Sequence, residues 1–245
     1  MNPLEGFKKW DFEEYTKHML EKGVTVDEIP EERGFLDGKS LFADSISLTS
    51  FPRAGNTMIR AYLDKITGIY TGSAIFFDNP MNKALKEGGL AGEAVNDKRV
   101  WIAKNHYPVS LGDTIFNSQK AILIVRNPLD VIPSQWNVSC TSTHSLSVHA
   151  DTYTDYSNLW DSYIKTSAIR CQKYVDFWLN SGIPVHVIRY EDCLLKPEET
   201  LTDLMKFIYS QKSLEGTRLE QHIKLACKKP APTVYKPRVG KINYN

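Results

Sequence analysis

The residues of this chain best suited to chemistry lie at positions 50–57, which read Ser-Phe-Pro-Arg-Ala-Gly-Asn-Thr. The alternating run 46–49 before them predicts a strand, and the apolar residues after them recur at helical spacing over 58–66. The first backbone N–H groups of a helix lack partners and its dipole favours an anion, while Arg53 adds a permanent cation. This pattern predicts a cradle for phosphate or sulfate. The alternative is an ordinary strand-to-helix turn with a surface arginine.

The loop differs from the common nucleotide-binding motif. That motif, GxxxxGK[ST], needs a lysine directly after its second glycine, and Asn56 occupies that position here. We also find no later acidic strand end suited to hold the magnesium ion of a nucleoside triphosphate. The sequence therefore favours phosphate binding without a magnesium-bound triphosphate, and a P-loop kinase of a small molecule is kept as an alternative.

Polar residues follow three further strand candidates. The candidates are the apolar runs 100–103, 121–125 and 185–188. The residues that follow them are His106, Arg126 and Tyr190. Because parallel strands present their carboxyl ends at one edge of a sheet, we expect these three residues to converge with Arg53.

Helical patterns separate the strand candidates. One begins at Pro128, a second covers 154–180, and a third covers 197–208. Strands that alternate with helices predict an α/β fold with a mostly parallel sheet, whose ligands bind outside the carboxyl ends of the strands.

The composition is that of an ordinary globular protein. The chain has 245 residues and a formal net charge of +1. We therefore expect a single domain over 1–245, with an N-terminal cap at 1–40 and a core at 45–245, and no binding to nucleic acid. No apolar stretch approaches the ~20 residues that span a bilayer, and the N-terminus lacks the apolar core of a signal peptide. We expect a cytoplasmic protein without a membrane span, and the sequence does not predict an oligomeric state.

The cysteines do not show the spacing of a metal site. They are far apart and form no CxxC pair: Cys140, Cys171, Cys193 and Cys227. Buried or free thiols are the simpler interpretation. We expect the chemistry of this chain to need no metal.

Several segments resemble motifs of PAPS-dependent sulfotransferases, in which PAPS is 3′-phosphoadenosine 5′-phosphosulfate. Residues 50–57 resemble the loop that binds the 5′-phosphosulfate. Residues 104–108, Lys-Asn-His-Tyr-Pro, resemble the segment that carries the catalytic histidine. Residues 126–130, Arg-Asn-Pro-Leu-Asp, with Ser134 resemble the motif that binds the 3′-phosphate.

The resemblance continues in the same order to the end of the chain. Residues 189–200 resemble a further segment of the family, and 236–241 resemble its closing Arg/Gly segment. Residues 54–57 and 67–73 look most like the sulfotransferase domain of WSC-domain-containing proteins. The matches together span 46–241.

The resemblance implies a P-loop-like three-layer fold, with a mostly parallel central sheet flanked by helices, and PAPS as co-substrate. It implies that His106 is the general base and that Arg53 and Lys104 stabilise charge on the transferred group. The residues that it implies for binding PAPS are Arg53, Ala54, Gly55, Asn56, Thr57, Met58, Arg126, Ser134, Tyr190, Arg238 and Gly240. Many relatives have a tryptophan at Met58 that stacks on adenine, so Met58 is a departure.

Each role has a simpler alternative. Asn56 and Thr57 would then cap the helix, Arg126 would pair with Asp130, and Lys104 would be solvated. A histidine at a strand end would then be structural.

The function expected from these motifs is transfer of the sulfuryl group of PAPS to an acceptor hydroxyl. Carbohydrate-modifying relatives often have arginine at the position of Arg53, so we expect a carbohydrate or glycoconjugate acceptor, framed by residues 74–98 and 140–153. The alternatives are the small-molecule kinase and a non-catalytic nucleotide-binding protein of the same fold. A Golgi lumen location is the alternative to the cytoplasm, because carbohydrate-modifying relatives work there.

Overall fold

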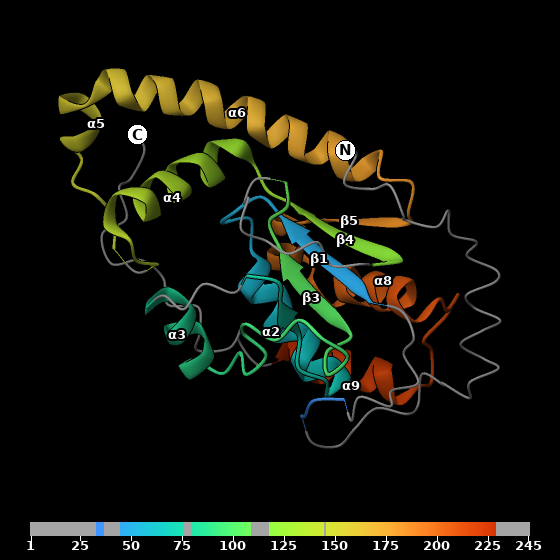
Figure 1. Cartoon of the computed structure of the whole chain (residues 1–245). Helices are drawn as coiled ribbons and strands as arrows, with labels where there is room; N and C mark the ends of the chain where they lie inside the picture. The colour runs from blue at the N-terminus through green and yellow to red at the C-terminus, as the bar shows by residue number, and fades with distance from the viewer. Residues whose placement is uncertain (1–32, 37–44, 76–79, 109–117, 145, 229–245) are drawn as a thin grey trace.

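The computed structural model describes residues 33–36, 45–75, 80–108, 118–144 and 146–228 (Figure 1). Within these residues the chain forms a five-stranded parallel sheet in the order β2-β3-β1-β4-β5. The strands are β1 (Ile46–Ser50), β2 (Gly72–Ser73), β3 (Ile102–Asn105), β4 (Lys120–Val125) and β5 (Val185–Arg189). The parallel sheet predicted from the sequence is confirmed.

Helices cover both faces of this sheet. Helix α6 (Ser157–Leu179) packs on one face, and α2 (Asn56–Thr67), α8 (Pro197–Tyr209) and α9 (Arg218–Lys228) pack together on the other (Figure 1). The described residues also form α3 (Pro80–Glu87), α4 (Pro128–Thr141), α5 (Thr152–Asp155) and α7 (Tyr190–Leu195). This is the predicted three-layer arrangement of helices, sheet and helices.

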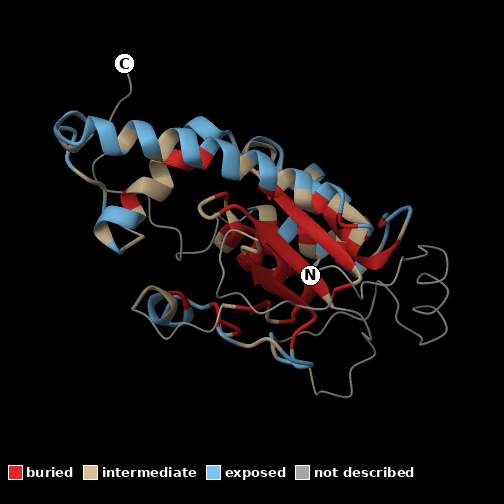
Figure 2. Cartoon of the chain, turned by 45° about the horizontal axis from the view of Figure 1, so that its top comes forward, coloured by how far each residue is buried: buried red, intermediate tan, exposed pale blue. Residues whose placement is uncertain are grey.

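The inner strands β1, β3 and β4 are buried because helices cover both of their faces. Leu48 of β1 and Ile122 of β4 have no exposed surface, and Figure 2 shows these inner strands mostly in the colour of buried residues. Tyr174 of α6 is in the hydrophobic core, as are Ile59 and Leu63 of α2. Strands covered on both faces read as apolar runs, which is why β4 is recognisable in the sequence.

The strand order places β1 where the chain changes direction across the sheet. From β1 the chain runs to β2 and β3 on one side, and later to β4 and β5 on the other. Ligands of open parallel sheets bind at such a point, outside the carboxyl ends of the strands. The ends of β1, β3 and β4 are therefore neighbours, as the sequence predicts.

Most predicted elements lie close to their expected bounds. The strand predicted at 100–103 begins later, at Ile102, and the helix predicted at 154–180 is interrupted at Tyr156, which separates α5 from α6. The sequence patterns do not predict α3, α7, α9 or β2. The expected cap at 1–40 lies outside the described residues, apart from 33–36. No helix within the described ranges is long and apolar enough to cross a membrane.

Candidate functional site

The loop between β1 and α2 presents unpaired backbone N–H groups. Gly55 is the N-cap of α2, and no side chain caps the helix. Within the part of the chain that the structure describes, the N–H groups of Gly55, Asn56 and Thr57 have no hydrogen-bond acceptor. Asn56 does not cap the helix, because its Nδ2 donates to the Leu48 carbonyl and to Ser50 Oγ, each at 3.2 Å. The loop thus has the unpaired N–H groups at a helix N-terminus that an anion cradle would need, and the cradle itself stays a prediction.

Two arginines meet beside this loop. Arg53 Nε donates to Ser134 Oγ at 3.1 Å, and its Nη1 donates to His144 Nδ1 at 2.6 Å. Arg126 Nη1 donates to the Arg53 carbonyl at 3.0 Å, and its guanidinium lies 4.4 Å from the ring centroid of Tyr190. Arg126 Nε is buried without a hydrogen-bond partner in the described residues. This cluster brings together residues predicted for both phosphates, and Arg126 Nε is available in it as a donor for an anion.

The turns that carry the cluster are linked to each other. Arg126 does not pair with Asp130, which was the simpler alternative for it. The side chain of Asn127 accepts from the Leu129 N–H and caps α4, and the Asn127 N–H donates to Glu191 Oε1 at 2.9 Å. The turn after β4 is therefore held against the first turn of α7.

His106 lies at the end of β3, next to the end of β1. Its Nδ1 lies 2.7 Å from the carbonyl oxygen of Ser50, and a carbonyl can only accept, so Nδ1 carries the hydrogen. Nε2 of the neutral ring is then the proton acceptor. Burial, with Lys104 as the second cause, lowers the pKa of His106 from 6.5 to about 3. The ring is therefore neutral at physiological pH, as a general base must be.

The segment after His106 is also held in place. Trp178 Nε1 of α6 donates to the Tyr107 carbonyl at 2.9 Å. The ring of Tyr107 packs edge-on against Phe177, with centroids 5.3 Å apart. These contacts fix the direction in which the chain leaves β3.

Lys104 is buried, with 6% of its surface exposed, so the solvated alternative is wrong. Its Nζ lies 3.5 Å from Glu93 Oε1, and the other oxygen of Glu93 accepts from Arg60 Nη1. Burial raises the pKa of Glu93, but Arg60 and Lys104 together leave that pKa below its usual value. The carboxylate is therefore charged between two cations.

The remaining predicted residues lie in different surroundings. Ala54 and Met58 are buried in the hydrophobic core, with 1% and 4% of their surfaces exposed. Thr57 is half-buried at the first turn of α2. Arg238 and Gly240 lie outside the described residues.

Reasoning from the sequence missed two residues of this region, Arg60 and Glu93. A signal for Arg60 was present, because the polar residues Asn56, Arg60 and Asp64 recur every four residues along α2. These three side chains are buried. Asn56 bonds to β1, and Arg60 and Asp64 bond to Thr71, just before β2. No sequence pattern points to Glu93. His144 lies in the segment 140–153 expected to frame the acceptor, but no pattern predicts its contact with Arg53, which is distant in the chain.

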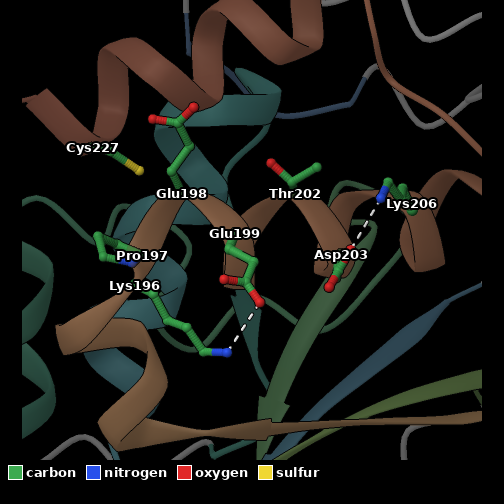
Figure 3. Close-up of a pocket in the computed structure, with 8 residues that line it drawn as sticks. All are labelled: Lys196, Pro197, Glu198, Glu199, Thr202, Asp203, Lys206 and Cys227. Carbon is green, nitrogen blue, oxygen red and sulfur yellow. Dashed lines mark hydrogen bonds and ion pairs between the residues drawn. The ribbon is translucent and has the colours of Figure 1, made fainter.

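A surface depression of about 660 Å³ lies elsewhere, along α8 (Figure 3). It is lined by Lys196, Pro197, Glu198, Glu199, Thr202, Asp203, Lys206 and Cys227. Its lysines are paired, Lys196 with Glu199 at 3.0 Å and Lys206 with Asp203 at 3.1 Å. None of the residues at the strand ends lines it, so we place the candidate site at the sheet edge.

The fold and its strand-end residues agree with a known family. A family model described as the sulfotransferase domain matches residues 44–233. The chain therefore belongs to the sulfotransferase domain family.

Within the described residues, no group of three or more His, Cys, Asp or Glu side chains is placed to hold a metal ion.

The chain is also similar to members of the WSCD family in two insects. It is 28% identical over 165 residues to a WSCD family member of Aedes aegypti, and 29% identical over 164 residues to one of Drosophila melanogaster. Each match covers 66% of this chain and 49% of the relative. The chain thus spans about half the length of the curated relatives it matches. The resemblance predicted to this group is confirmed.

Proposed function

We propose that this chain transfers the sulfuryl group of PAPS to the hydroxyl group of an acceptor, a carbohydrate or glycoconjugate. One observation carries the proposal. Unpaired N–H groups, two arginines and a neutral histidine meet where β1, β3 and β4 end. Transfer of a highly charged group depends on positioning and on electrostatic stabilisation, and these residues are suited to both.

The residues present fit the donor. The N–H groups of Gly55, Asn56 and Thr57 would bind the 5′-phosphosulfate, and Arg126 with Ser134 would bind the 3′-phosphate. Arg126 Nε supports this, because a buried donor without a partner fits an anionic ligand. PAPS supplies the sulfuryl group and leaves as 3′-phosphoadenosine 5′-phosphate. Arg53, between the two sets, would neutralise charge on the phosphates and the sulfuryl oxygens.

His106 would take the proton of the acceptor. As the acceptor oxygen bonds to sulfur and the bond from sulfur to the phosphate oxygen breaks, the hydroxyl proton moves to His106 Nε2. The hydrogen bond from Nδ1 to the Ser50 carbonyl keeps the ring in this tautomer. Anionic groups bound nearby raise the pKa of the ring and make it a stronger base than in the free protein.

The carbohydrate class of the acceptor rests on Arg53 and on the family resemblance. One of the two segments expected to frame the acceptor contributes to the cluster, since His144 contacts Arg53. The compartment stays a prediction, cytoplasmic with the Golgi lumen as the alternative.

Thermal unfolding with two ligands tests the proposal. A ligand that binds only the folded state at ~100 times its dissociation constant stabilises that state by about 2.7 kcal/mol. We expect the melting temperature to rise with 3′-phosphoadenosine 5′-phosphate and not with ATP and magnesium. A rise with ATP and magnesium alone would refute the proposal in favour of the kinase.

Two variants with matched controls test the roles. Arg126→Ala should weaken nucleotide binding by about 10–100-fold, the loss of charge-assisted hydrogen bonds, whereas Arg189→Ala, at the exposed end of β5, should not. His106→Ala should keep nucleotide binding and lose about 100–10,000-fold in rate, and His222→Ala, on α9 and outside both segments expected to frame the acceptor, is its control. Nucleotide binding by wild type and His106→Ala, without turnover in either on a panel of acceptors, would instead indicate a non-catalytic binding protein.

A further inference from the structure

A buried line of polar residues runs along one face of α2, from the end of β1 to the chain just before β2. Asn56, Arg60 and Asp64 are each at most 5% exposed. Asn56 bonds to β1, Arg60 Nε donates to Thr71 Oγ1 at 3.0 Å, and Asp64 Oδ1 accepts from the Thr71 N–H at 2.7 Å. Charged groups are rarely buried unless they are paired, so each of them needs a definite partner.

Glu93 is the partner that joins this line to β3. It comes from the turn before β3 and is 3% exposed. One carboxylate oxygen accepts from Arg60 Nη1, and the other lies 3.5 Å from Lys104 Nζ. Glu93 is therefore a bridge between a cation of α2 and a cation of β3.

The turn that carries Glu93 is held tightly against the neighbouring chain. A Cβ at Gly92 would lie 2.2 Å from the Thr71 carbonyl oxygen, so the backbones touch there. The Ser73 N–H donates to the Val95 carbonyl at 2.9 Å on the other side of the turn. The carboxylate of Glu93 thus has a fixed position before any ligand binds.

Lys104 of β3 is close to His106, the residue directly after this strand. Residues two apart in an extended chain point to the same side and are separated by roughly 6.6 Å along it. Glu93 thus acts on the lysine next to the proposed base. In agreement, Lys104 lowers the pKa of His106 and Glu93 raises it.

We propose that Glu93 is a positioning residue that acts through Lys104: its carboxylate, anchored by Arg60, holds the Lys104 ammonium beside His106, where the sulfuryl group is transferred. The inference rests on the proposed function of this site. Glu93 does not itself touch the reacting atoms.

Rates of four forms of the protein test the inference. Wild type, Glu93→Gln, Lys104→Gln and the double variant are assayed for sulfuryl transfer from PAPS. Glu93→Gln should lower kcat by about 10–100-fold, the size of effect that misplacement of a reacting group causes. The affinity of Glu93→Gln for 3′-phosphoadenosine 5′-phosphate should stay within about threefold of the wild-type value. The double variant should have the kcat of Lys104→Gln alone, because Glu93 acts only through Lys104.

Asp64→Asn is the matched control. It changes an equally buried carboxyl group on the same polar line that does not contact Lys104. It should lower the melting temperature and leave kcat within about threefold of wild type. If Glu93→Gln does not fold, Glu93→Asp replaces it in the same comparison. Aspartate keeps the negative charge, but its shorter side chain moves the carboxylate away from Lys104.

The outcomes separate the two proposals. Three outcomes would overturn the role of Glu93 and leave the proposed function standing. They are a double variant in which the two losses of kcat multiply, an unchanged kcat in Glu93→Gln, and a loss of kcat in Asp64→Asn equal to that in Glu93→Gln. A wild type that binds the nucleotide and transfers no sulfuryl group would overturn the proposed function and the inference together.

Discussion

Replacing Gly55 by alanine tests how tightly the loop after β1 packs against α7. A Cβ at position 55 would lie 2.4 Å from Cδ2 of Tyr190. The ring of Tyr190 has little room to move, because it is 6% exposed and the Arg126 guanidinium lies 4.4 Å from its centroid. Gly55 also has a φ of 105°, which residues with a Cβ rarely adopt. Both effects destabilise the folded state.

The magnitude follows from the two effects together. A left-handed backbone costs an alanine about 1–2 kcal/mol, and forcing extra atoms into a packed site costs about 1–3 kcal/mol. We expect Gly55→Ala to lower the free energy of unfolding by about 2–5 kcal/mol. For a chain of this size, that lowers the melting temperature by roughly 4–20 °C.

Urea unfolding and calorimetry measure this loss against a matched control. Gly182 has a φ of 78°, and no atom lies within 4 Å of its Cβ position. Gly182→Ala therefore has the backbone strain without the clash and should cost about 1–2 kcal/mol. Equal losses in the two variants would refute the reasoning, because they would mean that Tyr190 yields freely.

Four further predictions concern polar groups in or beside the core. The pKa of His106 is lowered from 6.5 to about 3 in the folded state, so the unfolded chain takes up a proton first as pH falls below 6.5, and the folded state loses stability. His106→Gln should therefore lose less free energy of unfolding than wild type between pH 7 and pH 5, as measured by urea unfolding. Asp64 changes stability in the opposite direction. Burial raises its pKa from 3.8 to about 6, so the folded state takes up a proton before the unfolded chain does and gains stability as pH falls. Asp64→Asn lacks this gain and should lose more free energy of unfolding than wild type between pH 7 and pH 5. The same direction of change in both variants would contradict this pair of predictions. Lys120→Met should lower the free energy of unfolding by about 2–4 kcal/mol, because Lys120 Nζ donates to the Phe207 and Ile208 carbonyls at the end of α8. Wild-type stability in this variant would mean that water takes over the hydrogen bonds of the ammonium group. Asn137→Ala should cost about 1–3 kcal/mol by leaving the Val148 N–H, now 2.6 Å from Asn137 Oδ1, without its acceptor; a melting temperature equal to that of wild type would show that this tie is dispensable.

The parts of the site that could be predicted are those set by local pattern. An apolar run, a Pro/Gly turn and a helical repeat identify the loop at 50–57, and the rule for parallel sheets then brings Arg53, His106 and Arg126 to one edge. His106 and Arg126 follow recognisable strands, so their approximate places were available without coordinates. Their hydrogen bonds were not, because the Ser50 and Arg53 carbonyls that accept them belong to another segment.

The burial of Lys104 shows why the rest could not be predicted. A lysine at the end of a strand is compatible with solvent or with a buried ion pair, and the choice depends on what the next layer places beside it. Here that layer supplies Glu93 and Arg60, which lie 11 and 44 residues before Lys104 in the chain. Pairing at such separations is decided by packing and not by local pattern.

The amino-acid sequence by itself determined the α/β fold, the position of the loop between β1 and α2, and the family, because these depend on periodicity and on short motifs. The tertiary structure alone decided how those residues are used. It set the tautomer and low pKa of His106, turned the side chain of Arg53 toward Ser134 and His144, and enclosed Lys104 with a carboxylate. The physical reason is that hydrogen-bond direction, burial and charge pairing depend on neighbours that only the folded chain brings together.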